Sequence, residues 1–96
     1  MIKERIINIL KNHSKEIKNF KVKSLSLFGS IARNEDRLES DIDIVVSFEG
    51  RATFDMYMDL KFYLEEICGR KVDLITENAL KPILKKHIQK DLIRVA

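Results

Sequence analysis

The 96-residue sequence contains few cysteine, proline, glycine and aromatic residues, and these shortages exclude several classes of protein. Its single cysteine, Cys68, excludes an internal disulfide bond. No apolar run approaches the roughly 20 residues of a membrane-spanning helix, and no charged-then-apolar leader opens the chain, so we expect a soluble cytoplasmic protein without a membrane partner. The sparse aromatic residues are not interleaved with basic ones, which argues against direct nucleic-acid binding through a stacking surface.

The length of the chain suits one small domain with a modest core, so residues 1–96 are expected to form a single unit. The net charge of +3 conceals an uneven distribution. Residues 1–23 carry seven Lys and Arg against two Glu, whereas residues 29–76 carry six against eleven Asp and Glu. Basic ends around an acidic middle suit a polyanionic substrate such as a nucleoside triphosphate, although amphipathic helices with lysine-rich solvent faces give the same pattern.

Hydrophobic periodicity predicts helices and strands in alternation. The segments, in the order helix, strand, short helix or turn, strand, helix, strand and helix, are residues 2–19, 22–28, 31–38, 41–48, 54–68, 70–75 and 82–95. Ser30 is available as the N-cap of the short helix, and Pro82 fits the first turn of the last one. The expected fold is α/β (α+β), a small mixed three-stranded sheet flanked by helices in the order α-β-α-β-α-β-α. A right-handed crossover makes the second and third strands parallel.

The stretch GSIARNEDRLESDIDIVV carries the functional prediction. Its Gly29-Ser30 pair follows an apolar strand directly and predicts a turn whose N–H groups and hydroxyl bind phosphate oxygens. After ten intervening residues come Asp41 and Asp43, whose side chains share one face of a strand about 7 Å apart. Paired carboxylates repel, and two divalent cations, as used in nucleotidyl transfer, would compensate them. Alone, such an Asp-x-Asp is also typical of a turn before a solvated edge strand.

Two further charged residues have two interpretations each. Asp73 interrupts an apolar strand and would supply the third carboxylate of a two-metal site, or would pair with Arg70 or Lys71. Arg33 would neutralise triphosphate charge, or would form a surface salt bridge with an acid at residues 35–36.

Two reactive residues fall on apolar helical stripes. His13 is expected to be a core or boundary histidine rather than a ligand. Cys68 is expected to be a buried core thiol, because no base is visibly placed beside it to make it a nucleophile.

With these residues in place, the chain resembles the minimal nucleotidyltransferases (MNT) of the DNA polymerase β superfamily. Within that superfamily it is most similar to the small MNT proteins encoded beside HEPN-domain partners as toxin–antitoxin pairs. The matching residues are Gly29-Ser30, Asp41-Ile42-Asp43, and Asp73 in its short strand, with Ala32-Arg33, Glu35 and Ser40 in common positions. Asn34 departs from the family, because many relatives have glycine after the arginine; asparagine tolerates the left-handed backbone region that such a turn needs.

The resemblance implies a function as well as a fold. It implies an Mg²⁺-dependent enzyme, with two ions, that transfers AMP from ATP to a tyrosine of a HEPN ribonuclease toxin and so neutralises it. The implied catalytic and metal-binding residues are Asp41, Asp43 and Asp73, and the implied nucleotide-binding residues are Gly29, Ser30 and Arg33. The alternatives are a non-catalytic antitoxin that occludes the toxin, and a nucleotidyltransferase acting on a small molecule or an RNA end.

Overall fold

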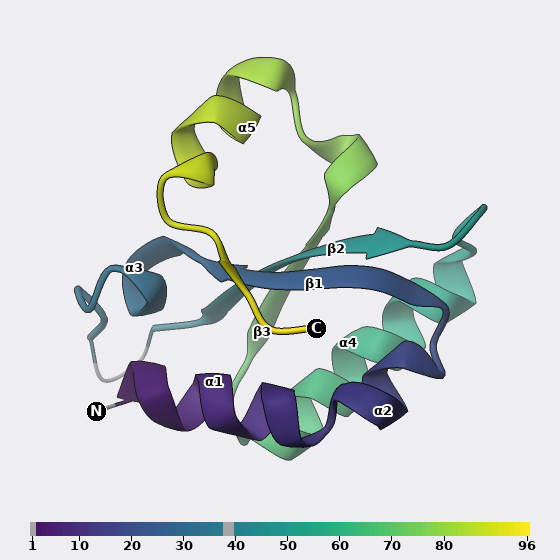
Figure 1. The fold of residues 1–96 in the computed structure, drawn as a ribbon, viewed down its shortest axis with the longest axis horizontal. Helices are drawn as coiled ribbons and strands as arrows, with labels where there is room; N and C mark the ends of the chain where they lie inside the picture. Colours follow the sequence, from purple (N-terminus) through teal and green to yellow (C-terminus); the bar gives the residue numbers. More distant parts are fainter. Residues whose placement is uncertain (1, 38–39) are drawn as a thin grey trace.

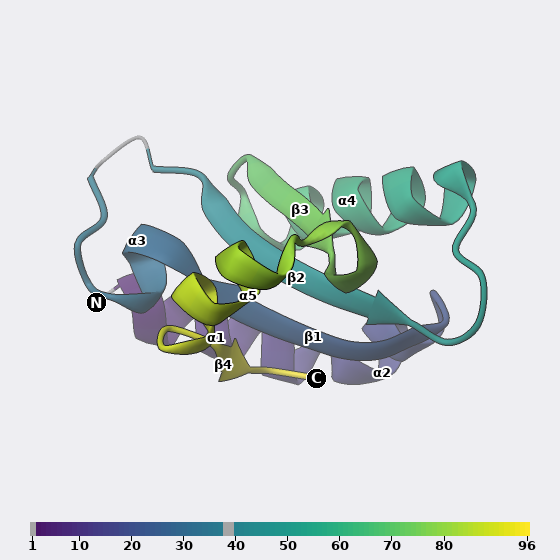
Figure 2. The same ribbon diagram turned by 90° about the horizontal axis from the view of Figure 1, so that it is seen from above.

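A computed structural model describes residues 2–37 and 40–96 of the chain. Its elements in chain order are α1 (Ile2–Asn12), α2 (Ser14–Lys18), β1 (Val22–Phe28), α3 (Gly29–Ala32), β2 (Ile42–Phe48), α4 (Phe54–Cys68), β3 (Val72–Thr76), the 3₁₀ turn η1 (Glu77–Ala79), α5 (Pro82–Gln89) and β4 (Ile93–Arg94). Helices α1, α2 and α4 cover one face of the sheet, and α5 lies over the other (Figure 1, Figure 2). No helix in the two described ranges is long and apolar enough to cross a lipid bilayer.

The sheet has the strand order β3-β2-β1-β4. Strands β2 and β3 are parallel, as the crossover through α4 predicts, and β1 is antiparallel to both β2 and β4. The mixed α/β fold class is therefore confirmed, but the sheet has a fourth strand where three were expected. The last helix ends at Gln89 instead of continuing to residue 95. The chain after it turns back to pair with the outer edge of β1, where Val95 donates a hydrogen bond to the Leu25 carbonyl at 2.9 Å.

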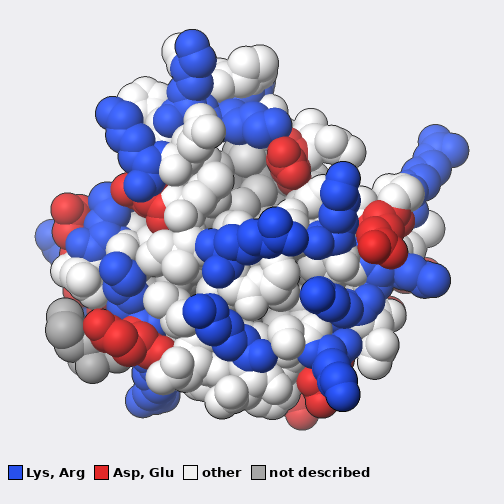
Figure 3. All heavy atoms as spheres, in the orientation of Figure 1, with Lys and Arg blue, Asp and Glu red and all other residues white. Residues whose placement is uncertain are grey.

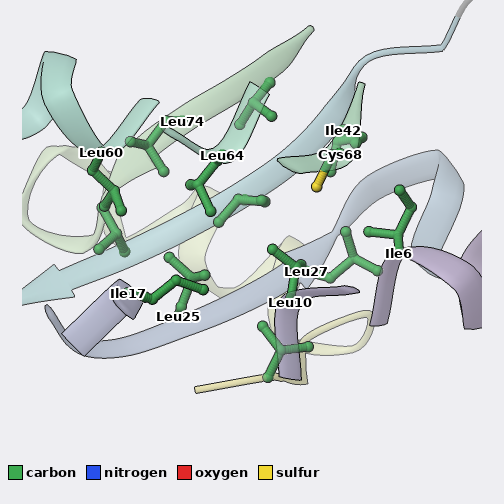
Figure 4. Packing of buried hydrophobic residues seen from close by; sticks show 14 of the residues in the cluster. Ile6, Leu10, Ile17, Leu25, Leu27, Ile42, Leu60, Leu64, Cys68 and Leu74 are labelled. Carbon is green, nitrogen blue, oxygen red and sulfur yellow. The ribbon is translucent and has the colours of Figure 1, made fainter. Parts of the chain in front are cut away.

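The core lies between the sheet and the three helices that cover one face. Alternate residues of the strands point into it, which reflects the period of two in a β-strand. Figure 4 shows the side chains that meet there, including Ile6, Leu10, Ile17, Leu25, Leu27, Ile42, Leu60, Leu64 and Leu74. Ile42, Ile44 and Val46 of β2 point into this core. The side chains of Asp43, Val45 and Ser47 therefore lie on the opposite face of the sheet, which we call the open face.

The predicted N-terminal helix over residues 2–19 is broken into α1 and α2 at His13. His13 has φ −105° and ψ 18°, and its ring donates from Nδ1 to the Ile9 carbonyl oxygen at 2.8 Å. The ring also packs edge-on against Tyr63, with 6.3 Å between ring centroids. His13 is thus a boundary residue with structural partners, as expected.

Helix α4 begins and ends as its sequence predicts. The Thr53 hydroxyl accepts a hydrogen bond from the Met56 N–H at 3.2 Å, and Gly69 ends the helix with φ 67°. Two contacts then fasten α4 to β3: the Tyr57 hydroxyl donates to the Leu74 carbonyl, and Glu65 accepts from the Val72 N–H at 3.0 Å. These contacts fix the strand that carries Asp73.

Cys68 at the end of α4 is 3% exposed, and burial raises the pKa of its thiol to about 11. Because the thiolate is the reactive form, we expect the native protein to resist a thiol reagent such as Ellman's reagent at pH 8. The same protein unfolded in urea should react at once at that pH. Rapid labelling of the native protein at pH 8 would contradict a buried thiol.

Candidate functional site

The acidic residues of the motif lie at one end of the open face. In the parallel pairing of β2 with β3, Asp43 is opposite Asp73, and in the antiparallel pairing of β1 with β2, Phe28 is opposite Asp43. Residues from three separate segments therefore meet where β1 ends and β2 begins. Asp41 lies one residue before β2 and is exposed. The strand thus starts one residue later than predicted, and of the two aspartates only Asp43 belongs to it.

The charge of Asp43 is poorly compensated. This side chain is half-buried, and its pKa is raised first by desolvation, then by the charge of Asp73 and then by that of Asp41; Arg33 opposes these effects. The charges of Asp73 and Asp41, the other two carboxylates predicted for the site, thus both act on Asp43. Such a group of like charges favours either a shared proton or a bound cation.

Gly29 packs directly against Asp43. It has φ +79°, a backbone conformation that side chains disfavour, and it is buried. A Cβ placed on Gly29 would overlap Oδ2 of Asp43 and lie 2.9 Å from its Cγ. Glycine is therefore required here on two grounds, and its backbone lies directly beside the Asp43 side chain.

Ser30 does not have the capping role that was predicted for it. Helix α3 begins at Gly29 and is only four residues long, with Phe28 as its N-cap residue and no side-chain cap hydrogen bond. Glycine starts the helix because its backbone geometry directs the chain from β1 straight into the first turn. The Ser30 carbonyl accepts from the Glu35 N–H at 2.8 Å, and Asn34 adopts φ +58°. The turn thus retains a left-handed residue with asparagine in place of glycine.

Arg33 forms two ion pairs. Its Nε lies 3.1 Å from Glu35, the local partner foreseen in the sequence, and its Nη1 lies 2.9 Å from Asp91, which lies between α5 and β4. These carboxylates raise the pKa of Arg33, mainly through the hydrogen bond with Asp91. Because 58 residues separate Arg33 from Asp91, no local pattern in the sequence could have indicated the contact. The guanidinium is near enough to Asp43 to lower its pKa.

Arg70, one of the two alternative partners proposed for Asp73, is engaged elsewhere. Arg70 donates from Nη1 to the Ser40 carbonyl at 3.0 Å, and the Ser40 hydroxyl accepts from the Arg37 N–H at 2.7 Å. These contacts hold the residue immediately before Asp41. Arg70 therefore positions the start of the acidic motif rather than neutralising Asp73.

The donor chemistry of the site suits Mg²⁺. Asp41, Asp43 and Asp73 supply only carboxylate oxygens, which hard divalent cations prefer. Within residues 2–37 and 40–96, no three His, Cys, Asp or Glu side chains are placed to hold a metal ion as they stand. The strand register nevertheless brings Asp43 and Asp73 together beside Asp41, and the raised pKa of Asp43 reflects the repulsion that a cation would relieve.

Comparisons with known proteins identify the family of the chain. Residues 4–95 match the family described as polymerase beta, nucleotidyltransferase. The chain is 50% identical over 94 residues to "Putative protein adenylyltransferase MJ1379" of Methanocaldococcus jannaschii, covering 94% of each chain. It is 36% identical over 93 residues to "Protein adenylyltransferase MntA" of Thermococcus cleftensis, covering 96% of this chain and 94% of that one.

Solved structures give the same result. "Structure of putative minimal nucleotidyltransferase" superposes with a TM-score of 0.85 at 30% identity, covering 97% of this chain and 95% of that chain. A tri-AMPylated Shewanella oneidensis HEPN toxin in complex with MNT antitoxin gives a TM-score of 0.68 at 18% identity, covering 94% and 71%, and shows the fold alone. The chain belongs to the polymerase β nucleotidyltransferase family, and it is a nucleotidyltransferase.

Proposed function

We propose that this nucleotidyltransferase transfers AMP from ATP to a tyrosine of a HEPN-domain ribonuclease toxin and thereby neutralises the toxin. The observation that carries the proposal is the meeting of Asp43, Asp73 and the Gly29 backbone at one end of the open face. The names of the two relatives support a protein acceptor, and the solved complex, which pairs an MNT antitoxin with a HEPN toxin, supports the partner. A soluble hetero-oligomer in the cytoplasm is part of the proposal.

The residues divide between binding and chemistry. The Gly29 turn and the Ser30 hydroxyl would hold the triphosphate, and Arg33 would neutralise part of its charge. Asp41, Asp43 and Asp73 would hold two Mg²⁺ ions, which when bound lower the pKa of the acceptor hydroxyl and stabilise charge on the phosphates. We propose that residues 1–96 act as one domain, because a single core runs from Ile6 to Val95.

The proposed reaction is an in-line displacement at the α-phosphorus. The acceptor oxygen forms a bond to the α-phosphorus while the bond to the oxygen that bridges the α- and β-phosphates breaks, and pyrophosphate leaves. The exposed Asp73 would accept the hydroxyl proton, directly or through water, and release it to solvent. The Asp73 carboxylate would also orient the attacking hydroxyl, because it accepts a hydrogen bond from it.

Intact-mass spectrometry tests the proposal. A HEPN-domain toxin proposed as the partner would be incubated with the enzyme, ATP and Mg²⁺, and with the Asp41→Asn/Asp43→Asn variant in parallel. We expect mass increments of AMP on the HEPN protein with the wild type and none with the variant. Unchanged mass, together with equally tight binding of the toxin by both forms, would replace the proposal with simple occlusion.

Arg33 offers a separate test of the triphosphate site. We expect Arg33→Ala to weaken ATP binding by about tenfold, because a charge-assisted contact to phosphate is lost. Asp91→Asn should instead strengthen ATP binding, because it releases Arg33 from a competing carboxylate. Arg51→Ala, at an exposed arginine in the loop before α4, is the matched control, and calorimetric titration provides the measurement. Equal ATP affinity in Arg33→Ala and the wild type would show that Arg33 does not bind the triphosphate and only forms its two ion pairs.

A further inference from the structure

The open face has a pocket beside the carboxylates. A hollow of about 200 Å³ lies between the sheet and the segment that crosses over it, with Ser24, Ser26, Val45 and Ser47 as its floor and Ile88 and Leu92 among its roof. Figure 2 looks down on this arrangement, with α5 in front of β1 and β2. Floor and roof come from segments that are distant in the sequence, so the pocket exists only in the folded chain.

The strand register places this floor next to the acidic site. Val45 follows Asp43 by two residues on the open face of β2, which corresponds to about 7 Å along the strand. In the antiparallel pairing, Ser26 is opposite Val45 and Ser24 is opposite Ser47. The pocket therefore begins one side chain beyond Asp43. In a nucleotide, only a ribose separates the α-phosphate from the base. The step of about 7 Å from Asp43 to Val45 leaves room for that ribose between the acidic site and the pocket.

The size and lining of the pocket indicate the ligand class. A cavity of about 150 Å³ can hold benzene, so a hollow of about 200 Å³ has room for one flat ring system but not for a whole nucleoside triphosphate. The Val45 side chain below and Ile88 and Leu92 above supply apolar surfaces for the two faces of a ring. The hydroxyls of Ser24 and Ser26 can each donate or accept a hydrogen bond at its polar edge.

An ion pair holds the roof over the floor. Lys85 of α5 lies 3.0 Å from Glu77 of η1, which follows β3, and both residues also line the pocket. Their hydrogen bond is the main reason that the pKa of Glu77 is lowered. Several lysines lie exposed along α5 and the face around it (Figure 3). The pocket is covered in part by α5, which carries exposed lysines.

We infer that this pocket is the base subsite of the nucleotide, and that it holds the purine ring of ATP between Val45 and the Ile88–Leu92 roof. The inference rests on the proposed function, because it takes the triphosphate to lie at Gly29 and the carboxylates. A larger hollow of about 390 Å³ lies around Thr53, Phe54 and Asn78, beyond the far end of the floor. It shares Val46, Ser47 and Glu77 with the smaller pocket and extends from there away from Asp43, toward the loop before α4.

The test compares ATP with inorganic tripolyphosphate, which has the phosphates but no base. Calorimetric titrations with Mg²⁺ would use the wild type, Ser26→Leu, which fills the pocket, and Ile88→Ala, which removes part of its roof. Ser14→Leu makes the same chemical change in α2, on the other side of the sheet, and serves as the matched control.

We expect Ser26→Leu to weaken ATP binding by about tenfold or more, because the filled pocket no longer admits the base. Ile88→Ala should also weaken ATP binding. Tripolyphosphate should bind all forms equally, because it has no base. Ser14→Leu should bind both ligands like the wild type. If the ratio of the two affinities is the same in both pocket variants and in the wild type, the inference is wrong although the proposed function stands. A wild type that binds neither ligand would overturn the proposed function itself and the subsite with it.

Discussion

Replacing Asp43 by asparagine is expected to reduce AMP transfer by about a thousandfold or more, because the neutral amide removes a negative charge and a proposed metal ligand from the site. Asp43 is the one carboxylate that lies inside β2, is half-buried, and faces both Asp73 and the Gly29 backbone. The measurement is the rate at which AMP is attached to the proposed HEPN partner, with ATP and Mg²⁺ saturating. Asp55→Asn, at an exposed acid in the first turn of α4, is the matched control and should retain full activity.

The same substitution should stabilise the protein in the absence of metal. Desolvation, Asp73 and Asp41 raise the pKa of Asp43 in the folded state. A carboxyl whose pKa is higher folded than unfolded costs stability as the pH rises through that interval, and the full cost is present at neutral pH. Asp43→Asn removes this cost, so its melting temperature at pH 7 without Mg²⁺ should exceed that of the wild type.

Mg²⁺ should reverse that difference. A ligand that binds only the folded state raises the melting temperature, so Mg²⁺ with ATP should stabilise the wild type and have little effect on Asp43→Asn. At acidic pH, where Asp43 is protonated, the two proteins should melt alike. An Asp43→Asn protein that is less stable than the wild type at pH 7 without metal would show that Asp43 makes a favourable contact that outweighs its repulsion.

Gly29→Ala is expected to have the second largest effect. The added methyl group would overlap Asp43 and would also force alanine to adopt φ +79°. We expect a loss of about 3 kcal/mol in the free energy of unfolding, and a fall in AMP transfer of about a hundredfold because Asp43 is displaced. Urea unfolding and the transfer assay measure the two effects separately.

The chain contains matched controls for this substitution. Gly50 and Gly69 have φ +71° and +67°, but a Cβ at either would meet nothing within 4 Å. Gly50→Ala and Gly69→Ala should therefore cost only the backbone strain, about 1 kcal/mol each, and leave transfer unchanged. If Gly29→Ala lost no more stability and no more transfer activity than these two variants, the close approach of Gly29 to Asp43 would matter neither for folding nor for catalysis.

Most of the secondary structure could be predicted because its signals are local. The apolar stripes, the Thr53 and Gly69 caps of α4 and the position of Pro82 each act within one or two helical turns. The errors arose where tertiary contacts outweighed local preference. His13 breaks the first helix, and the tail leaves its helical pattern to pair with the edge of β1. Ser30 looked like a cap, but the preceding glycine starts the turn.

The sequence by itself determined which residues could form the site, because paired carboxylates and a Gly-Ser turn have few other uses at that spacing. It also predicted that β2 and β3 would be parallel, since the helix between them can carry the chain back to the end of the sheet where β2 began. Only the tertiary structure decided the register that sets Asp43 opposite Asp73, and the contact of Gly29 with Asp43. It alone brought Asp91 to Arg33 and laid α5 over the pocket. These features depend on how distant segments pack together, and no local pattern in the sequence records that packing.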